Sequence, residues 1–299
     1  MRKVRKYSPR DMKGLIYIAP WLIGLLVFQM YPFIESFIYS FADFNMHKSL
    51  QFVGLKNYIR LFTRDREFYS SLFITLRYTV FTVPGKIVFA LLIAVILNRD
   101  IKGINVIRTV YYLPSLLSGS VAVSILWKLM FMGDGVINAM LGWLGVPPVA
   151  WLGSPKVALT TISMLEIWQF GSSMVLFLAA LKQVPHELHE AAEIDGARKA
   201  RVFFSVTLPM ITPIIFFNLI MQTITALQNF TSAFVITGGG PMKSTYVLGM
   251  KLYTEAFKNY KMGYTSAISW VLFAMILAVT LLLFRSSSMW VHYSDGEEM

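Results

Sequence analysis

Residues 263–284 read GYTSAISWVLFAMILAVTLLLF, a run without a single charged side chain. A transmembrane helix needs about 20 consecutive, mostly apolar residues to cross a hydrocarbon core about 30 Å thick. The strands of a membrane β-barrel would instead show segments of about 10 residues in which apolar and polar side chains alternate. This continuous run therefore predicts an α-helix that crosses a lipid bilayer.

The composition of the whole chain is that of an integral membrane protein. Of its 299 residues, 56% are hydrophobic and 14% are charged, and the mean hydropathy is +0.59. A soluble domain carries roughly 25% charged residues, and disorder requires low hydrophobicity, so both classes are excluded. The absence of cysteine excludes disulfides, thiolate zinc sites and a cysteine nucleophile. The net charge of +11 fits lysines and arginines that flank membrane spans.

Five further apolar runs predict five further spans. Three of them carry no charge: 14–34, 109–127 and 209–236. The run 78–97 contains Lys86, and the run 157–181 contains Glu166. One ionisable group at a helix centre costs about 2.5–3.5 kcal/mol, which the apolar neighbours offset. The expected fold class is an all-α integral membrane protein with six transmembrane helices.

The distribution of basic residues predicts the orientation. Six lysines and arginines occupy the first 13 residues, and the short connection 98–103 carries Arg99 and Lys102. Such residues are enriched in cytoplasmic segments, so we expect both termini in the cytoplasm. The first apolar run is too long for the apolar core of a cleaved signal peptide. The expected segments are a basic cytoplasmic N-terminus, a transmembrane domain and a cytoplasmic tail, at 1–13, 14–286 and 287–299.

The most polar inner stretch after the N-terminus is PHELHEAAEIDGARKARVFFSVTLPMITP, at 185–213. Helix formers extend to Glu193, and Gly196 interrupts them. Glycine adopts positive φ without strain, so the pattern predicts two short helices joined by a turn, in a loop at about 183–208. Such a helix pair is a natural surface for a soluble partner. An amphipathic connector without a partner is the alternative.

Residues 190–209 also carry a specific pattern, in which EAA is followed by three residues, G, nine residues and VTLP. The pattern resembles the EAA loop of the permease subunits of ATP-binding-cassette (ABC) importers, which ends in Ile-x-Leu-Pro. Three other stretches resemble the carbohydrate (maltose-type) branch of that family: FVGLKNY at 52–58, NVIRTVYYLP at 105–114 and GGGP at 238–241.

The resemblance implies a transmembrane permease subunit of an ATP-driven importer in a prokaryotic cytoplasmic membrane. The substrate would be a carbohydrate, an oligosaccharide, that an extracytoplasmic solute-binding protein delivers. The other partners implied are a second, homologous permease and two ATP-binding-cassette ATPase subunits. In that family the EAA loop docks on the ATPase. The resemblance assigns this coupling role to Glu190, Ala191, Ala192, Asp195, Gly196, Leu208 and Pro209.

Two motifs that suggest other chemistry fail on spacing. TGGGPMKST at 237–245 lacks the glycines that a phosphate-binding loop places one and six residues before its lysine. HELHE at 186–190 separates its histidines by three residues, whereas zinc binding by HExxH requires four. We therefore expect no catalytic residue, no metal and no cofactor in this chain. ATP and Mg would be bound by the partner ATPase subunits.

Polar side chains interrupt the fourth and fifth predicted spans. Amides, hydroxyls and an aromatic face are groups that bind sugars, and the maltose-type permeases place their sugar contacts on these two spans. Interhelical hydrogen bonds, worth about 0.6 kcal/mol each on average, are the alternative role. The expected substrate path consists of Glu166, Trp168, Gln169, Ser172, Gln222, Thr225, Gln228 and Asn229.

Two other functions stay open from the sequence. An importer of the same type for another polar solute, such as a glycerol phosphate ester, would need a basic residue in its cavity, and Lys86 is the only central candidate. An ion-coupled secondary transporter would work alone. Such transporters often contain inverted repeats with discontinuous helices, and the sequence shows no convincing repeat.

Overall fold

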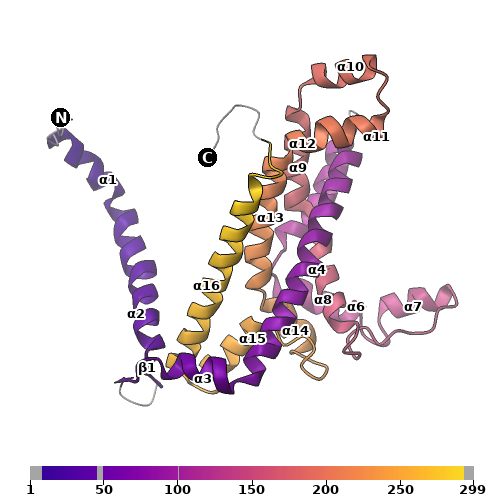
Figure 1. Ribbon diagram of the computed structural model, residues 1–299. Coiled ribbons are helices and arrows are strands. Elements are labelled where there is room, and N and C mark those ends of the chain that lie inside the picture. The colour runs from indigo at the N-terminus through magenta and orange to yellow at the C-terminus, as the bar shows by residue number, and fades with distance from the viewer. Residues whose placement is uncertain (1–8, 46–49, 100, 293–299) are drawn as a thin grey trace. The chain divides into compact units, whose positions relative to one another are not determined.

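The computed structural model describes residues 9–45, 50–99 and 101–292 (Figure 1). The chain divides into two compact units. The first unit consists of Met1–Asp65 and Leu252–Phe273, and the second consists of Arg66–Lys251 and Ala274–Met299. Almost all of the described secondary structure is helical. The exception in the described residues is a two-stranded sheet, which the all-α prediction did not include.

The first unit contains the first candidate membrane span. Its elements are α1 (Pro9–Leu25), the π-helical turn η1 (Leu26–Met30), α2 (Tyr31–Ser40), β1 (Ala42–Asp43), β2 (Gln51–Phe52), α3 (Lys56–Arg64), η3 (Thr254–Lys258) and the first half of α16 (Met262–Ser287). β1 and β2 pair antiparallel. Phe33 and Phe37 of α2 each pack against Trp270 of α16, with ring centroids 4.7 Å apart.

The second unit is built around the long helix α4. Its elements are α4 (Arg66–Leu97), α5 (Ile104–Leu116), α6 (Val121–Met130), α7 (Val136–Trp143), α8 (Ala158–Trp168), α9 (Gly171–Gln183), α10 (His186–Ile194), α11 (Lys199–Val202), η2 (Phe203–Thr207), α12 (Leu208–Met210), α13 (Thr212–Leu227), α14 (Thr231–Thr237), most of α15 (Leu248–Tyr253) and the second half of α16.

Helix α4 packs against α8, α9 and α13. The core between them includes Tyr78, Ile162 and Phe177, which are fully buried. Helix α9 in turn packs closely on α5, because a Cβ atom at Gly171 would lie 2.7 Å from the Tyr111 carbonyl oxygen. A larger residue at this position would push the two helices apart.

The structure contains three to six candidate membrane spans. Three helical stretches are long and apolar enough to cross a membrane alone: Tyr17–Ser40, Arg66–Leu97 and Met262–Ser287. Three bent helix pairs bring the number to six if each pair is one span. The pairs are Ile104–Leu116 with Val121–Met130, Ala158–Trp168 with Gly171–Gln183, and Lys199–Met210 with Thr212–Leu227.

The bends correct the expectation of one helix per apolar run. The run 109–127 breaks with a bend of 101°, and the break contains Gly119 at a φ of +74°. The run 157–181 bends by 45°. The run 209–236 contains two prolines, which remove backbone donors. It bends by 65° near its start, and α13 ends at Leu227, before the separate helix α14.

Candidate functional site

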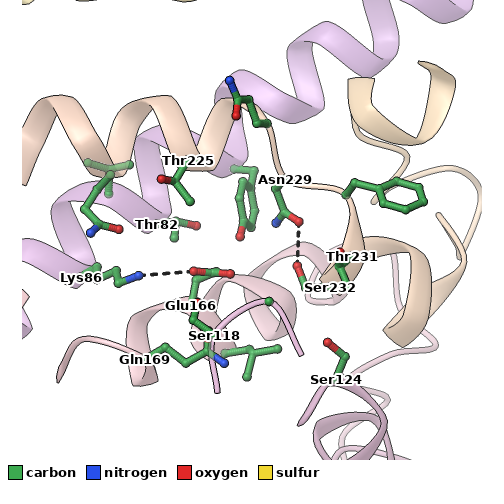
Figure 2. Close-up of a pocket in the computed structure, with 18 residues that line it drawn as sticks. Thr82, Lys86, Ser118, Ser124, Glu166, Gln169, Thr225, Asn229, Thr231 and Ser232 are labelled. Carbon is green, nitrogen blue, oxygen red and sulfur yellow. Dashed lines mark hydrogen bonds and ion pairs between the residues drawn. The ribbon is translucent and has the colours of Figure 1, made fainter. Parts of the chain in front are cut away.

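The second unit contains a partly open cavity of about 250 Å3 (Figure 2). Its lining comes from α4, the end of α8, the end of α13, the start of α14 and the segment that leads into it, together with the break between α5 and α6 and the first turn of α6. The residues of α4 that line it are Tyr78, Thr82, Val83 and Lys86. Tyr78, Thr82 and Lys86 follow one another at intervals of four, so they share one face of the helix.

An ion pair crosses one side of the cavity. Lys86 Nζ of α4 lies 3.4 Å from Glu166 Oε2 of α8, and Figure 2 shows the two side chains facing each other. The Lys86 side chain is 6% exposed and that of Glu166 is 19% exposed. An ammonium group at this burial needs a counter-charge. The pair therefore links two helices and leaves the cavity without an unbalanced charge from Lys86.

Four polar atoms of the cavity lining are buried and make no hydrogen bond of good geometry among the described residues, although the Tyr78 hydroxyl lies close to the side chains of Thr82, Asn229 and Ser232. They are Tyr78 Oη, Thr82 Oγ1, Gln169 Oε1 and Asn229 Nδ2. A buried donor or acceptor that stays unpaired costs about 1–3 kcal/mol. The set combines an amide donor, an amide acceptor and two hydroxyls that can do either. The cavity can therefore bind a small polar molecule that both donates and accepts hydrogen bonds.

Neighbouring side chains hold two of the cavity amides in place. Asn229 Oδ1 accepts a hydrogen bond of 2.8 Å from Ser232 Oγ, and the Asn229 side chain also lies close to the Tyr78 hydroxyl. Gln222 Nε2 donates to Ser173 Oγ of α9 at 3.2 Å. Orientation by such contacts is what a specific binding site requires.

The structure brings six of the eight residues of the expected substrate path to this cavity: Glu166, Gln169, Gln222, Thr225, Gln228 and Asn229. The other two do not line it. Trp168 is 41% exposed and packs against Trp127, with ring centroids 5.8 Å apart. Ser172 is exposed on the first turn of α9. Tyr78 and Thr82 were not predicted from the sequence, although Tyr78, Thr82 and Lys86 visibly follow one another at intervals of four residues.

The loop between α9 and α13 has the predicted helix–turn–helix form. Helix α10 ends at Ile194, Gly196 adopts a φ of +74°, and α11 begins at Lys199. No residue of α10 is buried. Figure 1 shows α10 and α11 at the end of the second unit opposite α6 and α14. Helix α10 therefore presents a free surface at one end of this unit.

Within this loop, the seven residues of the expected coupling set separate into two groups. Glu190, Ala191, Asp195 and Gly196 are exposed, and Ala192 is half-buried. Leu208 and Pro209 lie on α12 and are half-buried. A contact of 3.1 Å between His189 Nε2 and Thr207 Oγ1 connects α10 to the segment just before α12.

The glycine-rich segment 238–245 folds against itself and against α4. Thr237 Oγ1 and Thr245 Oγ1 lie 2.6 Å apart, and the Gly239 N–H donates to Thr237 Oγ1. Lys243 donates a hydrogen bond to the Glu67 carboxylate, which raises the pKa of Lys243. This lysine therefore stays positively charged and is engaged with a carboxylate.

Comparison with known proteins identifies the family. Residues 67–292 match the family described as binding-protein-dependent transport system inner membrane component. The probable ABC transporter permease protein YesP of Bacillus subtilis is 44% identical over 301 residues, which cover 100% of this chain and 97% of the relative. The trehalose/maltose transport system permease protein MalF of Thermococcus litoralis is 35% identical over 287 residues, covering 94% of this chain and 95% of the relative.

A solved structure shares the fold. A chain of a bacterial alginate ABC transporter, in complex with an alginate pentasaccharide-bound periplasmic protein, superimposes with a TM-score of 0.80 at 21% identity, covering 93% of this chain and 94% of that chain. This likeness shows the shared fold, and the family match with the relatives confirms the resemblance found in the sequence. The chain therefore belongs to the binding-protein-dependent transport system inner membrane components, as a multi-pass permease subunit of an ABC importer.

Proposed function

We propose that this permease imports a carbohydrate, an oligosaccharide, through a path that includes the cavity of Figure 2. The observation that carries the proposal is the set of four buried polar atoms in the cavity lining that make no hydrogen bond of good geometry among the described residues. Sugar hydroxyls both donate and accept, so a bound sugar can form hydrogen bonds with the polar groups of this lining. Relatives named as permeases for trehalose and maltose, for multiple sugars and for lactose support this substrate class.

The ion pair favours an uncharged substrate over a phosphate ester. A glycerol phosphate ester would need a free cation in the cavity, and Lys86 is engaged with Glu166 at 3.4 Å. A phosphate would have to compete with this carboxylate for the ammonium group. Membership of the ABC importer family also argues against an ion-coupled secondary transporter.

The proposed assembly contains a second, homologous permease, two ATPase subunits that bind ATP and Mg, and an extracytoplasmic binding protein. The exposed helix α10 supplies a surface for an ATPase, through Glu190, Ala191, Ala192, Asp195 and Gly196. The periplasmic protein in the related alginate transporter supports a binding protein as partner.

The proposed topology has six spans within 14–286 and both termini in the cytoplasm. An ATPase that binds α10 requires this end of the second unit to face the cytoplasm, as the basic residues of the connection 98–103 also indicate. The terminal segments 1–8 and 293–299 lie outside the described residues.

Removing an unpartnered cavity hydroxyl should weaken transport without weakening the fold. Tyr78→Phe and Thr82→Val each delete a buried hydroxyl that makes no hydrogen bond of good geometry among the described residues. Each lost hydrogen bond to the sugar is worth about 0.5–1.5 kcal/mol, a several-fold rise in the substrate concentration for half-maximal uptake. The measurement is uptake of labelled oligosaccharides by the complete transporter in vesicles, together with its melting temperature.

Thr79→Val is the matched control on the same helix. The Thr79 hydroxyl donates to the Thr75 carbonyl oxygen at 2.9 Å, and Thr79 is not part of the cavity lining. Uptake should keep its concentration dependence in this variant. If Tyr78→Phe and Thr82→Val transport every tested sugar as the unchanged protein does, the cavity is not the sugar site.

A further inference from the structure

Helix α3 presents an apolar stripe to its surroundings. Leu55, which precedes the helix, and Ile59 and Phe62 within it are 59%, 59% and 49% exposed. Their spacing of four and three residues places them on one face. The opposite face is the one that packs on the protein, because Asn57 and Leu61 are buried. The three side chains of the apolar stripe therefore keep about half or more of their surface exposed.

A basic stripe runs beside the apolar one. Lys56, Arg60 and Arg64 follow one another at intervals of four, so they line the flank of α3 between its apolar and buried faces. All three side chains are exposed. The Arg60 guanidinium lies 4.6 Å from the centre of the Tyr264 ring.

Two carboxylates close to this stripe each have a partner of their own. Asp65, directly after α3, accepts a hydrogen bond from the Tyr264 hydroxyl, and Glu255 pairs with Lys261 at 3.2 Å. Among the described residues, no ion pair joins Lys56 or Arg64 to a carboxylate. The stripe therefore keeps a positive charge and suits an anionic surface.

The buried face of α3 is attached to the end of the first candidate span. Asn57 Nδ2 donates to the carbonyl oxygens of Ser40 and Ala42 at 3.0 and 2.9 Å, and Tyr58 Oη donates to Ser40 Oγ at 2.8 Å. Ser40 is the last residue of the span Tyr17–Ser40. These contacts hold α3 at the end of this candidate span.

The start of a second candidate span lies at the same level. The Gly263 N–H, in the first turn of α16, donates to the Phe44 carbonyl oxygen at 3.1 Å. A Cβ atom at Gly263 would lie 2.0 Å from the Ala42 carbonyl oxygen, so only glycine permits this approach. Helix α3 is thus joined to the ends of two spans, and the next span, Arg66–Leu97, begins two residues after α3.

We propose that α3 lies in the membrane interface and binds anionic phospholipid. The apolar stripe of Leu55, Ile59 and Phe62 enters the boundary between headgroups and acyl chains, and the basic stripe contacts lipid phosphates. A basic amphipathic helix at this depth is held by both its apolar area and its charge. The position of α3 at two span ends and its adjacent apolar and basic stripes favour lipid over a soluble protein as the occupant. The inference is independent of the imported substrate.

Spin labels on single cysteines test the depth of the helix, because the native chain contains no cysteine. Ile59→Cys and the control Arg64→Cys are labelled in the complete transporter, in vesicles of phosphatidylethanolamine and phosphatidylglycerol. For each label we compare its accessibility to oxygen, which dissolves in the bilayer, with its accessibility to a water-soluble nickel complex. We expect the ratio of the first to the second to be several-fold higher at position 59 than at position 64. A water-exposed label at 59 would overturn the proposal. Shielding at 59 that appears only when the binding protein is added would also overturn it and identify a protein-docking surface.

A second comparison tests the role of lipid phosphate. Replacing phosphatidylglycerol with phosphatidylcholine should move the label at 59 toward water. The double variant Lys56→Gln/Arg64→Gln should lose this dependence on phosphatidylglycerol, while Lys156→Gln, which removes an exposed lysine from the second unit, should keep it. If the depth of the label at position 59 is the same with phosphatidylglycerol as with phosphatidylcholine while Lys56, Arg60 and Arg64 are all present, the proposed contact with lipid phosphate is wrong.

Discussion

Glu166→Gln should destabilise the assembled transporter by about 3–5 kcal/mol, because it leaves a buried ammonium group without its counter-charge. Lys86 is 6% exposed, and its side chain lies 3.4 Å from the Glu166 carboxylate. The substitution keeps the size of the side chain and removes only its charge. The measurement is the melting temperature of the purified complex, which should fall clearly below that of the unchanged protein.

Two controls separate the loss of the pair from the loss of any charge. The double variant Lys86→Met/Glu166→Gln removes both charges and should recover most of the lost stability. Lys243→Gln breaks the contact of a lysine whose side chain is 67% exposed, and exposed pairs contribute about 0–1 kcal/mol. Equal melting temperatures for Glu166→Gln and Lys243→Gln would contradict a structural role for the buried pair.

Gly196→Val should disconnect the permease from its ATPase. Gly196 has a φ of +74°, and a left-handed conformation costs residues other than glycine roughly 1–2 kcal/mol, more for a β-branched side chain. A Cβ atom there meets nothing within 4 Å, so the backbone conformation alone opposes valine. The turn should reopen and displace α10. We expect at least a tenfold loss of ATP hydrolysis stimulated by the loaded binding protein, or loss of the ATPase on co-purification.

Gly145→Val provides the same backbone change elsewhere. Gly145 follows α7 with a φ of +73°, and a Cβ atom there also meets nothing within 4 Å. This variant should carry a similar local strain and keep its ATPase and its stimulated hydrolysis. If the two variants behave alike in both assays, the turn at Gly196 has no special part in coupling.

The apolar runs predicted where the membrane helices lie but not how they bend. Hydropathy averages over a window, whereas a bend depends on single residues such as Gly119 and on prolines such as Pro209. The start of α4 was missed for a related reason. Helix α4 begins at Arg66, twelve residues before the predicted run 78–97. The apolar run starts later than the helix because Glu67 and Arg77 lower the local hydropathy of the first turns of α4.

The candidate cavity was predictable where polar residues cluster in an apolar run. Gln222 and Asn229 belong to such a cluster, and both line the cavity. Tyr78 and Thr82 do not stand out, because isolated hydroxyls are ordinary in membrane helices, and only the packing of α4 against α8 and α13 brings them to the cavity. Trp168 was expected there for its aromatic face. Helix α8 ends at Trp168, and the Trp168 ring packs on Trp127 rather than lining the cavity.

Uptake by purified components tests the proposed function most directly. The complete complex, with both permeases and both ATPases, is placed in vesicles with ATP on the ATPase side. The binding protein and labelled oligosaccharides are added on the other side. We expect accumulation of a sugar only when ATP, the binding protein and all subunits are present, and none with this chain alone under an ion gradient. Accumulation by this chain alone, driven by that gradient, would contradict the account.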